Sequence, residues 1–171
     1  AGLFFRFDAT NILKKNLASI VTSISKDHLD WLPKNEQTIE KIVFEKTSSL
    51  LNSNIIIANQ NNKSAMNSIK KNIDKNQSNK IIFNEDFSFS ERENNFFYFE
   101  DKFGGLKLPN PNVRGQFQLE NISTAIATLR ALNLSIKDEH IKKGIKKINN
   151  LARLQEINTG KLKELVKNNL F

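Results

Sequence analysis

The sequence predicts an α/β fold, a mostly parallel sheet flanked by helices with a small antiparallel appendage. Two patterns predict it. In the first half of the chain, short runs rich in β-branched residues alternate with segments whose apolar residues recur at helical spacing. Between residues 87 and 109 the pattern changes to loose alternation around a Gly-Gly turn. Strand–helix–strand alternation favours a parallel sheet, because each parallel connection needs a crossover.

The first half supplies the parallel part. Its most apolar run, Ile55-Ile56-Ile57, is typical of a buried strand. The expected elements are strands at 17–24, 54–58 and 80–83 and helices at 36–51 and about 65–73. In such folds ligands bind beyond the carboxyl ends of the strands, and the polar loop that bears His28 lies at such an end.

The second half supplies the appendage and further helices. Ile122, Ile126 and Leu129 share one face of a helix, which predicts an amphipathic element there. Strands are expected at 87–90, 95–100 and 106–109, and helices at 120–133, about 137–148 and 161–169.

The composition describes a globular chain without disulfides. It has 171 residues, a formal charge of +8 and no cysteine, which excludes disulfides and a cysteine nucleophile. Of its 26 basic residues 21 are Lys, and they are scattered, whereas nucleic-acid sites gather charge on one face and favour Arg. We therefore expect a solvated lysine-rich surface and no nucleic-acid partner.

No apolar run approaches the roughly 20 residues that cross a bilayer, so we expect no membrane partner and a cytoplasmic location. The chain begins at Ala1 without Met and stops at an apolar Leu170-Phe171. We expect it to be part of a larger protein.

Five short stretches carry residues suited to ligand chemistry, and their order is more informative than any one of them. They are Arg-Phe-Asp-Ala-Thr-Asn at 6–11, Thr-Ser-Ile-Ser-Lys-Asp-His-Leu-Asp-Trp-Leu at 22–32, Glu-Lys at 45–46, Gly-Gln-Phe-Gln-Leu-Glu-Asn at 115–121 and Ala-Arg-Leu-Gln at 152–155. In this order they resemble the motifs of the folylpolyglutamate synthase / dihydrofolate synthase family, within the Mur ligase superfamily. The resemblance covers nearly the whole chain.

The resemblance implies a part of a larger enzyme of folate biosynthesis. Residues 1–153 would form the C-terminal half of an ATP-binding domain, and residues 154–171 the linker and the start of a C-terminal glutamate-ligase domain. Enzymes of the family use ATP and Mg²⁺ to convert a carboxylate of dihydropteroate or folate into an acyl phosphate, which the amine of L-glutamate attacks. A monomer is expected for the full-length protein.

Two residues, His28 and Lys46, are implied as catalytic groups and metal ligands. Taken alone, a histidine at a strand end is more often a surface residue, and Lys46 is one helix lysine among many. The resemblance makes His28 a magnesium ligand and Lys46 a carbamylated lysine. The added oxygens would suit a cation that prefers oxygen ligands.

Three residues are implied in ATP binding. Gln118 and Asn121 lie three apart near an expected helix start, so both can face one ligand, although Asn121 could simply cap the helix. The resemblance assigns this motif to the nucleotide base. Arg153 has the planar fork that suits phosphate oxygens, and the resemblance places it on the ATP phosphates.

Asp8 and Ala9 are implied in the pterin or folate pocket, although Asp in a short turn often serves only its own backbone. The chain departs from the family at three places. It has Phe4-Phe5 where the family has Gly-Gly, Phe117 where it has His, and Ala152 where it has Gly.

Part of the family's machinery is missing from these residues. No Gly-x-x-x-x-Gly-Lys-Ser/Thr phosphate loop occurs in the sequence, so we expect residues 1–171 alone to have no ligase activity. Two alternatives stay open: a ligase for another acyl acceptor, such as a muramyl peptide, and a non-catalytic binding module of the same fold.

Overall fold

The computed structural model describes residues 13–27, 29–48, 50, 53–75, 77–92, 95–113, 115–148, 160–161 and 163–164. The strands are β1 (Ala18–Val21), β2 (Asn54–Ile57), β3 (Lys80–Ile82), β4 (Phe87–Arg92), β5 (Phe96–Asp101) and β6 (Gly104–Pro109). The helices are α1 (Ile39–Thr47), α2 (Lys63–Ile73), α3 (Gln116–Ala131) and α4 (Asp138–Lys146), with short 3₁₀ turns at Leu29–Trp31 and Lys34–Glu36.

The three expected parallel strands are confirmed. They pair in the order β1-β2-β3, and Ile56 of β2 lies between Ile20 and Ile81 in the register. β1 is shorter than expected and ends at Val21. The backbone beyond it no longer bonds as a strand, because Thr22 and Ile24 bond to the side chain of Gln60.

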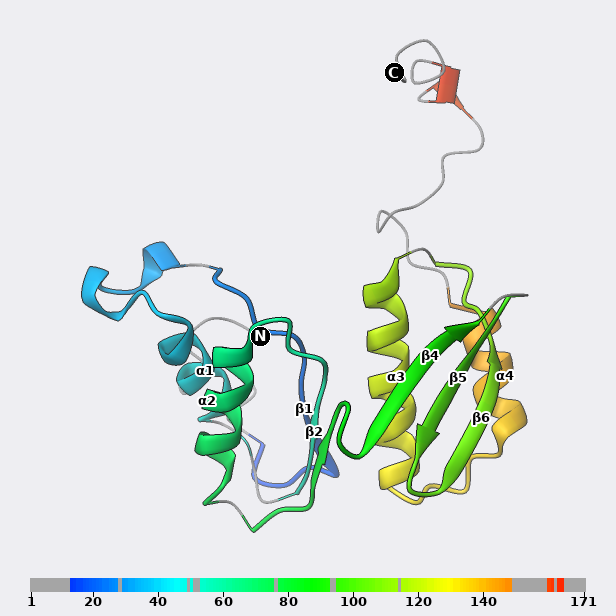
Figure 1. Cartoon of the computed structure of the whole chain (residues 1–171), viewed down its shortest axis with the longest axis horizontal. Helices are drawn as coiled ribbons and strands as arrows, with labels where there is room; N and C mark the ends of the chain where they lie inside the picture. Colours follow the sequence, from blue (N-terminus) through cyan, green and yellow to red (C-terminus); the bar gives the residue numbers. More distant parts are fainter. Residues whose placement is uncertain are drawn as a thin grey trace.

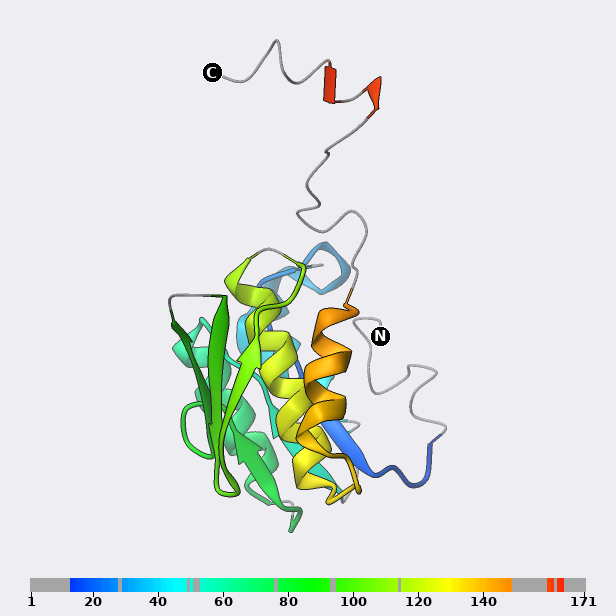
Figure 2. The same cartoon turned by 90° about the vertical axis from the view of Figure 1, so that its right-hand side faces the viewer.

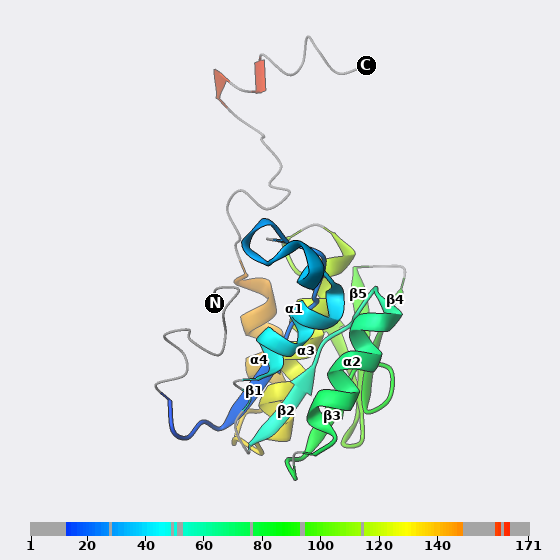
Figure 3. The same cartoon turned by 90° about the vertical axis from the view of Figure 1, so that its left-hand side faces the viewer.

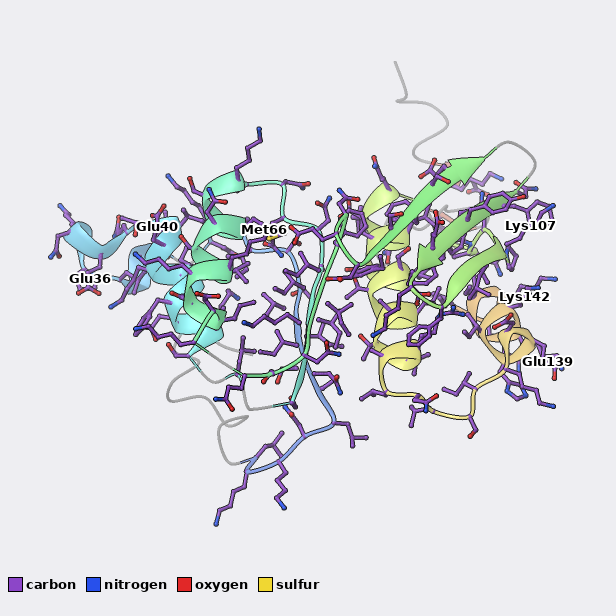
Figure 4. All side chains as sticks on the ribbon, turned by 60° about the horizontal axis from the view of Figure 1, so that its bottom comes forward. Glu36, Glu40, Met66, Lys107, Glu139 and Lys142 are labelled. Carbon is purple, nitrogen blue, oxygen red and sulfur yellow. The ribbon has the colours of Figure 1, made fainter. Side chains whose placement is uncertain are left out.

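The two faces of the parallel sheet pack against different helices. Ile55 and Ile57 point into a core shared with α1 and α2. Met66 of α2 packs against this core, on the side of the helix that faces the sheet (Figure 4). Ile56 points the other way, into a core shared with α3 and α4, because successive strand residues face opposite sides. Figures 1 and 3 show α1 and α2 on one face of the strands and α3 on the other.

The helix boundaries follow local capping. α1 begins after Thr38, whose hydroxyl accepts a hydrogen bond from the backbone of Lys41, rather than at residue 36. α3 begins at Gln116, four residues before the expected start. Gly115 has φ 105°, a conformation that glycine adopts without steric cost, and it turns the chain into the helix there.

The antiparallel strands form a separate three-stranded sheet in the order β4-β5-β6. Each of its strands has six residues, and the expected antiparallel addition is therefore confirmed. Phe97 and Phe99 on its inner face are fully buried in the core shared with α3, α4 and Ile56. Figure 2 shows the sheet beside α3 and α4, so the antiparallel unit and the parallel sheet share one core through α3.

Charged side chains of both signs project from the described surface. Figure 4 shows Lys107, Glu139 and Lys142 on the side of β6 and α4, and Glu36 and Glu40 on the side of α1. This mixture agrees with the scattered lysines of the sequence. Among the described residues, no helix has both the length and the apolar character that crossing a bilayer requires.

Candidate functional site

The exits of β1 and β2 lie at one edge of the parallel sheet, where ligands of such folds bind. The segment that follows β1 leads to Asp27, and the segment that follows β2 is the polar run Ala-Asn-Gln-Asn-Asn at 58–62. The start of α3 joins this edge, because Asn59 Nδ2 donates a hydrogen bond of 2.9 Å to Glu120 Oε1. Two segments predicted to carry chemistry, residues 22–27 and the start of α3, therefore approach one edge.

Lys46 lies near the end of α1 and is half-buried. Burial lowers the pKa of its ammonium group below the ordinary value, and the nearby Asp27 carboxylate opposes this by raising it. Asp27 immediately precedes His28 in the sequence. The structure thus places the Lys46 side chain within electrostatic reach of the segment that leads to His28.

The neighbouring Glu45 is fully buried, which is unusual for a carboxylate. Its Oε1 lies 3.7 Å from Nζ of Lys41, and the same ammonium lies 2.7 Å from Glu36 Oε2. The Glu-Lys pair of the motif therefore differs in setting: one side chain is buried and ion-paired, and the other is half-exposed near Asp27.

Gln118 and Asn121 lie in the first two turns of α3. Asn121 is exposed and lies inside the helix, so it does not cap it. Gln118 is only 4% exposed, and its Nε2 has no hydrogen-bond partner among the described residues. A buried amide without a partner costs free energy, and an incoming acceptor would remove that cost.

Two residues at the exit of β2, Asn59 and Gln60, were missed by sequence reasoning. Gln60 Oε1 accepts from the backbone N–H of Ile24 at 2.9 Å, and its Nε2 donates to Thr22 O at 3.1 Å and to Ala58 O at 3.0 Å. The available signal was their position in a polar run directly after a buried strand.

An open pocket of about 430 Å³ lies beside the Asn59–Glu120 hydrogen bond. Its lining combines amides, carboxylates and two phenylalanine rings: Asn59, Phe83, Asn84, Phe89, Glu91, Gln116 and Glu120. The volume falls in the range of small-molecule sites, and the lining offers hydrogen-bond acceptors next to an apolar surface.

Four predicted site residues, His28, Arg153, Asp8 and Ala9, lie outside the described residues. In the part of the chain that the structure describes, no three His, Cys, Asp or Glu side chains form a group that could hold a metal ion.

Comparison with known proteins agrees with the fold. No family model matches the chain. Among curated proteins, the dihydrofolate synthase/folylpolyglutamate synthase of Haemophilus influenzae is 28% identical over 165 residues, which cover 96% of this chain and 35% of that protein.

Two solved structures have the same fold. FolC of Escherichia coli, in complex with DHPP and ADP, is 30% identical and has a TM-score of 0.74 over 91% of this chain and 35% of its own. The apo form of L. casei FPGS is 22% identical, has a TM-score of 0.75 and is covered to 40% of its length. In sequence and fold, the chain corresponds to about one third of a member of the dihydrofolate synthase/folylpolyglutamate synthase family.

Proposed function

We propose that the chain is the nucleotide- and metal-binding part of a longer ATP-dependent ligase that joins L-glutamate to dihydropteroate or to folate glutamates. One observation carries the proposal: both the segment that follows β1 and leads to Asp27, and the start of α3, bond to the residues that follow β2. They do so in a chain 30% identical to E. coli FolC, whose structure holds DHPP and ADP.

The start of α3 would bind the adenine of ATP. A Gln or Asn amide offers one acceptor and two donors, which suit the N6 amino group and the ring nitrogens of adenine. The unpartnered Nε2 of Gln118 is such a donor, and the exposed Asn121 lies three residues further along the helix. In this role Gln118 orients the base, and Arg153 would neutralise charge on the phosphates.

Lys46 would support the metal. Its lowered pKa raises the fraction of neutral amine, the form that adds to CO₂ to give a carbamate and release a proton. The carbamate oxygens, the Asp27 carboxylate nearby and His28 form a donor set that fits Mg²⁺, which prefers oxygen. Mg²⁺ bound there would neutralise phosphate charge during transfer.

The remaining chemistry would be positioning. The chain holds the nucleotide while a folate carboxylate attacks the γ-phosphorus, ADP leaves, and the glutamate amine displaces phosphate from the acyl phosphate. Asp8 and Ala9 would contribute to the pterin or folate pocket. The full-length enzyme would act as a cytoplasmic monomer in folate metabolism.

The test is an assay of the longer polypeptide that contains this chain. With ATP, Mg²⁺, L-glutamate and either dihydropteroate or tetrahydrofolate, we expect release of phosphate that depends on both organic substrates. Residues 1–171 alone should show none. Phosphate release with a muramyl peptide and L-glutamate, but with neither pterin, would refute the folate assignment.

The carbamate has a separate test. In the longer protein supplied with ¹³C-bicarbonate, a carbamate carbon signal should appear and should be lost in Lys46→Arg. As a matched control, Lys142→Arg, on the exposed face of α4, should retain the signal. A signal unchanged by Lys46→Arg would place the carbamate elsewhere and contradict the assigned role.

A further inference from the structure

We infer that Asn59 and Gln60, adjacent at the exit of β2, are positioning residues that hold the two halves of the candidate site in register. The metal half is the segment 22–27 with Lys46, and the nucleotide half is the start of α3. This inference rests on the proposed function for its kinetic consequence and on described contacts for its geometry.

Gln60 holds the metal half. Its amide is 8% exposed and uses one acceptor and two donors on backbone groups, at 2.9, 3.1 and 3.0 Å. Two of these bonds go to Thr22 and Ile24, just beyond the end of β1. The segment therefore leaves the sheet in a direction set by β2, and three residues later it places Asp27 near Lys46.

Asn59 holds the nucleotide half. Its Nδ2 donates to Glu120 at 2.9 Å and lies 3.3 Å from Asn61 Oδ1. Glu120 stands between Gln118 and Asn121 in the sequence of α3. Fixing this carboxylate fixes the rotation of the first turns of the helix relative to β2.

The two residues are adjacent but bond to different segments: Gln60 to residues 22 and 24, and Asn59 to Glu120 of α3. One rigid dipeptide therefore sets the separation of the two halves. Catalytic geometry is sensitive to displacements of about 1 Å, so loss of either contact should impair catalysis. The two losses should differ in kind, since Gln60 serves the metal half and Asn59 the nucleotide half.

Hydrogen exchange on the chain itself tests the geometry. In Gln60→Leu, the amide of Ile24 should exchange roughly 10- to 100-fold faster, because it loses its buried acceptor. The increase should be confined to residues 22–27, and β3 should be unaffected. In the control Gln77→Leu, at an exposed position, exchange at Ile24 should be unchanged. An unchanged Ile24 amide, or a uniform increase along the chain, would overturn the inference.

A second variant covers the case in which Gln60→Leu does not fold. Gln60→Glu keeps the size and the acceptor but has no donor for Thr22 and Ala58 while ionised. The protection of residues 22–27 should fall when the carboxyl group ionises and recover in part when it is protonated, because the acid then has one O–H donor. Protection that does not change with pH would contradict a role for the two donated bonds.

Kinetics of the longer ligase test the functional half. Gln60→Leu should lower kcat at least 10-fold and leave the KM for ATP within threefold of the wild-type value. Asn59→Leu should raise the KM for ATP at least 10-fold and leave kcat within threefold. The exposed controls Gln77→Leu and Asn67→Leu should change neither constant. Equal effects of both site variants on kcat and KM would overturn the inference. Absence of ligase activity in the wild-type protein would refute the proposed function. The hydrogen-exchange pattern would still decide whether Asn59 and Gln60 hold the two segments in place.

Discussion

Arg130 connects α3 to the antiparallel sheet, and its removal should destabilise the whole fold. Its Nε and an Nη atom bond the two carboxylate oxygens of Asp101 at 2.8 and 3.0 Å. The guanidinium also bonds the carbonyl of Gly104 at 3.3 Å and lies 5.6 Å from the ring centre of Phe103. The side chains of Arg130 and Asp101 are 15% and 7% exposed, so the pair is largely desolvated.

The perturbation is Arg130→Met, which keeps the aliphatic stem and removes the charge. Asp101 would keep one bond, from the backbone N–H of Phe103 at 2.8 Å, and lose two charge-assisted bonds. Each such bond contributes about 1.5–3 kcal/mol, and breaking a fully buried pair costs about 3–5 kcal/mol. Because this pair is partly exposed, we expect a loss of about 2–4 kcal/mol in the free energy of unfolding.

Urea denaturation of the 171-residue chain measures this loss, and a thermal scan should show a melting temperature lower by roughly 4–16 °C. Arg130→Lys should recover only part of the stability, because lysine lacks the fork. Lys142→Met, at an exposed position, should change the free energy of unfolding by less than about 0.5 kcal/mol. A loss below about 0.5 kcal/mol in Arg130→Met would refute the reasoning, as would additive effects with Asp101→Asn in a double-mutant cycle.

Three further predictions concern single side chains. Ile56→Ala should lower the free energy of unfolding by about 2–5 kcal/mol in urea denaturation, since Ile56 is fully buried. Ile20→Ala, on the same face but 47% exposed, should lower it by less than about 1 kcal/mol. Equal losses would contradict the core assignment. Gln118→Leu should raise the free energy of unfolding by about 1 kcal/mol, because it removes an unpartnered buried amide, and should weaken ATP binding to the longer ligase in calorimetry. The folded pKa of Lys46 is lowered, so the unfolded chain binds more protons between that pKa and 10.5, and the free energy of unfolding should rise with pH there. Lys46→Met should be more stable than the wild type near neutral pH, with the difference closing above pH 10.5; a constant difference would exclude this linkage.

Local patterns were sufficient to predict the parallel half of the fold. The run Ile55-Ile56-Ile57 and the helical spacing of Ile39, Ile42 and Val43 are readable along the chain, and all lie where periodicity placed them. The motif Glu45-Lys46 was likewise recognisable from order and spacing. The roles of Lys46, Gln118 and Asn121 stay predictions.

Contacts between distant residues were not predictable in this way. The bond from Ile24 to Gln60 spans 36 positions and that from Asn59 to Glu120 spans 61, and nothing in the local sequence specifies either partner. The early start of α3 depends on the φ angle of Gly115, and the size of the antiparallel unit depends on burial of its inner face against α3. Periodicity and motif order are properties of neighbouring residues, so the amino-acid sequence alone specified the elements and the candidate chemistry. Which side chains meet at the sheet edge is set by packing of strands and helices far apart in the chain, and only the folded structure determines that.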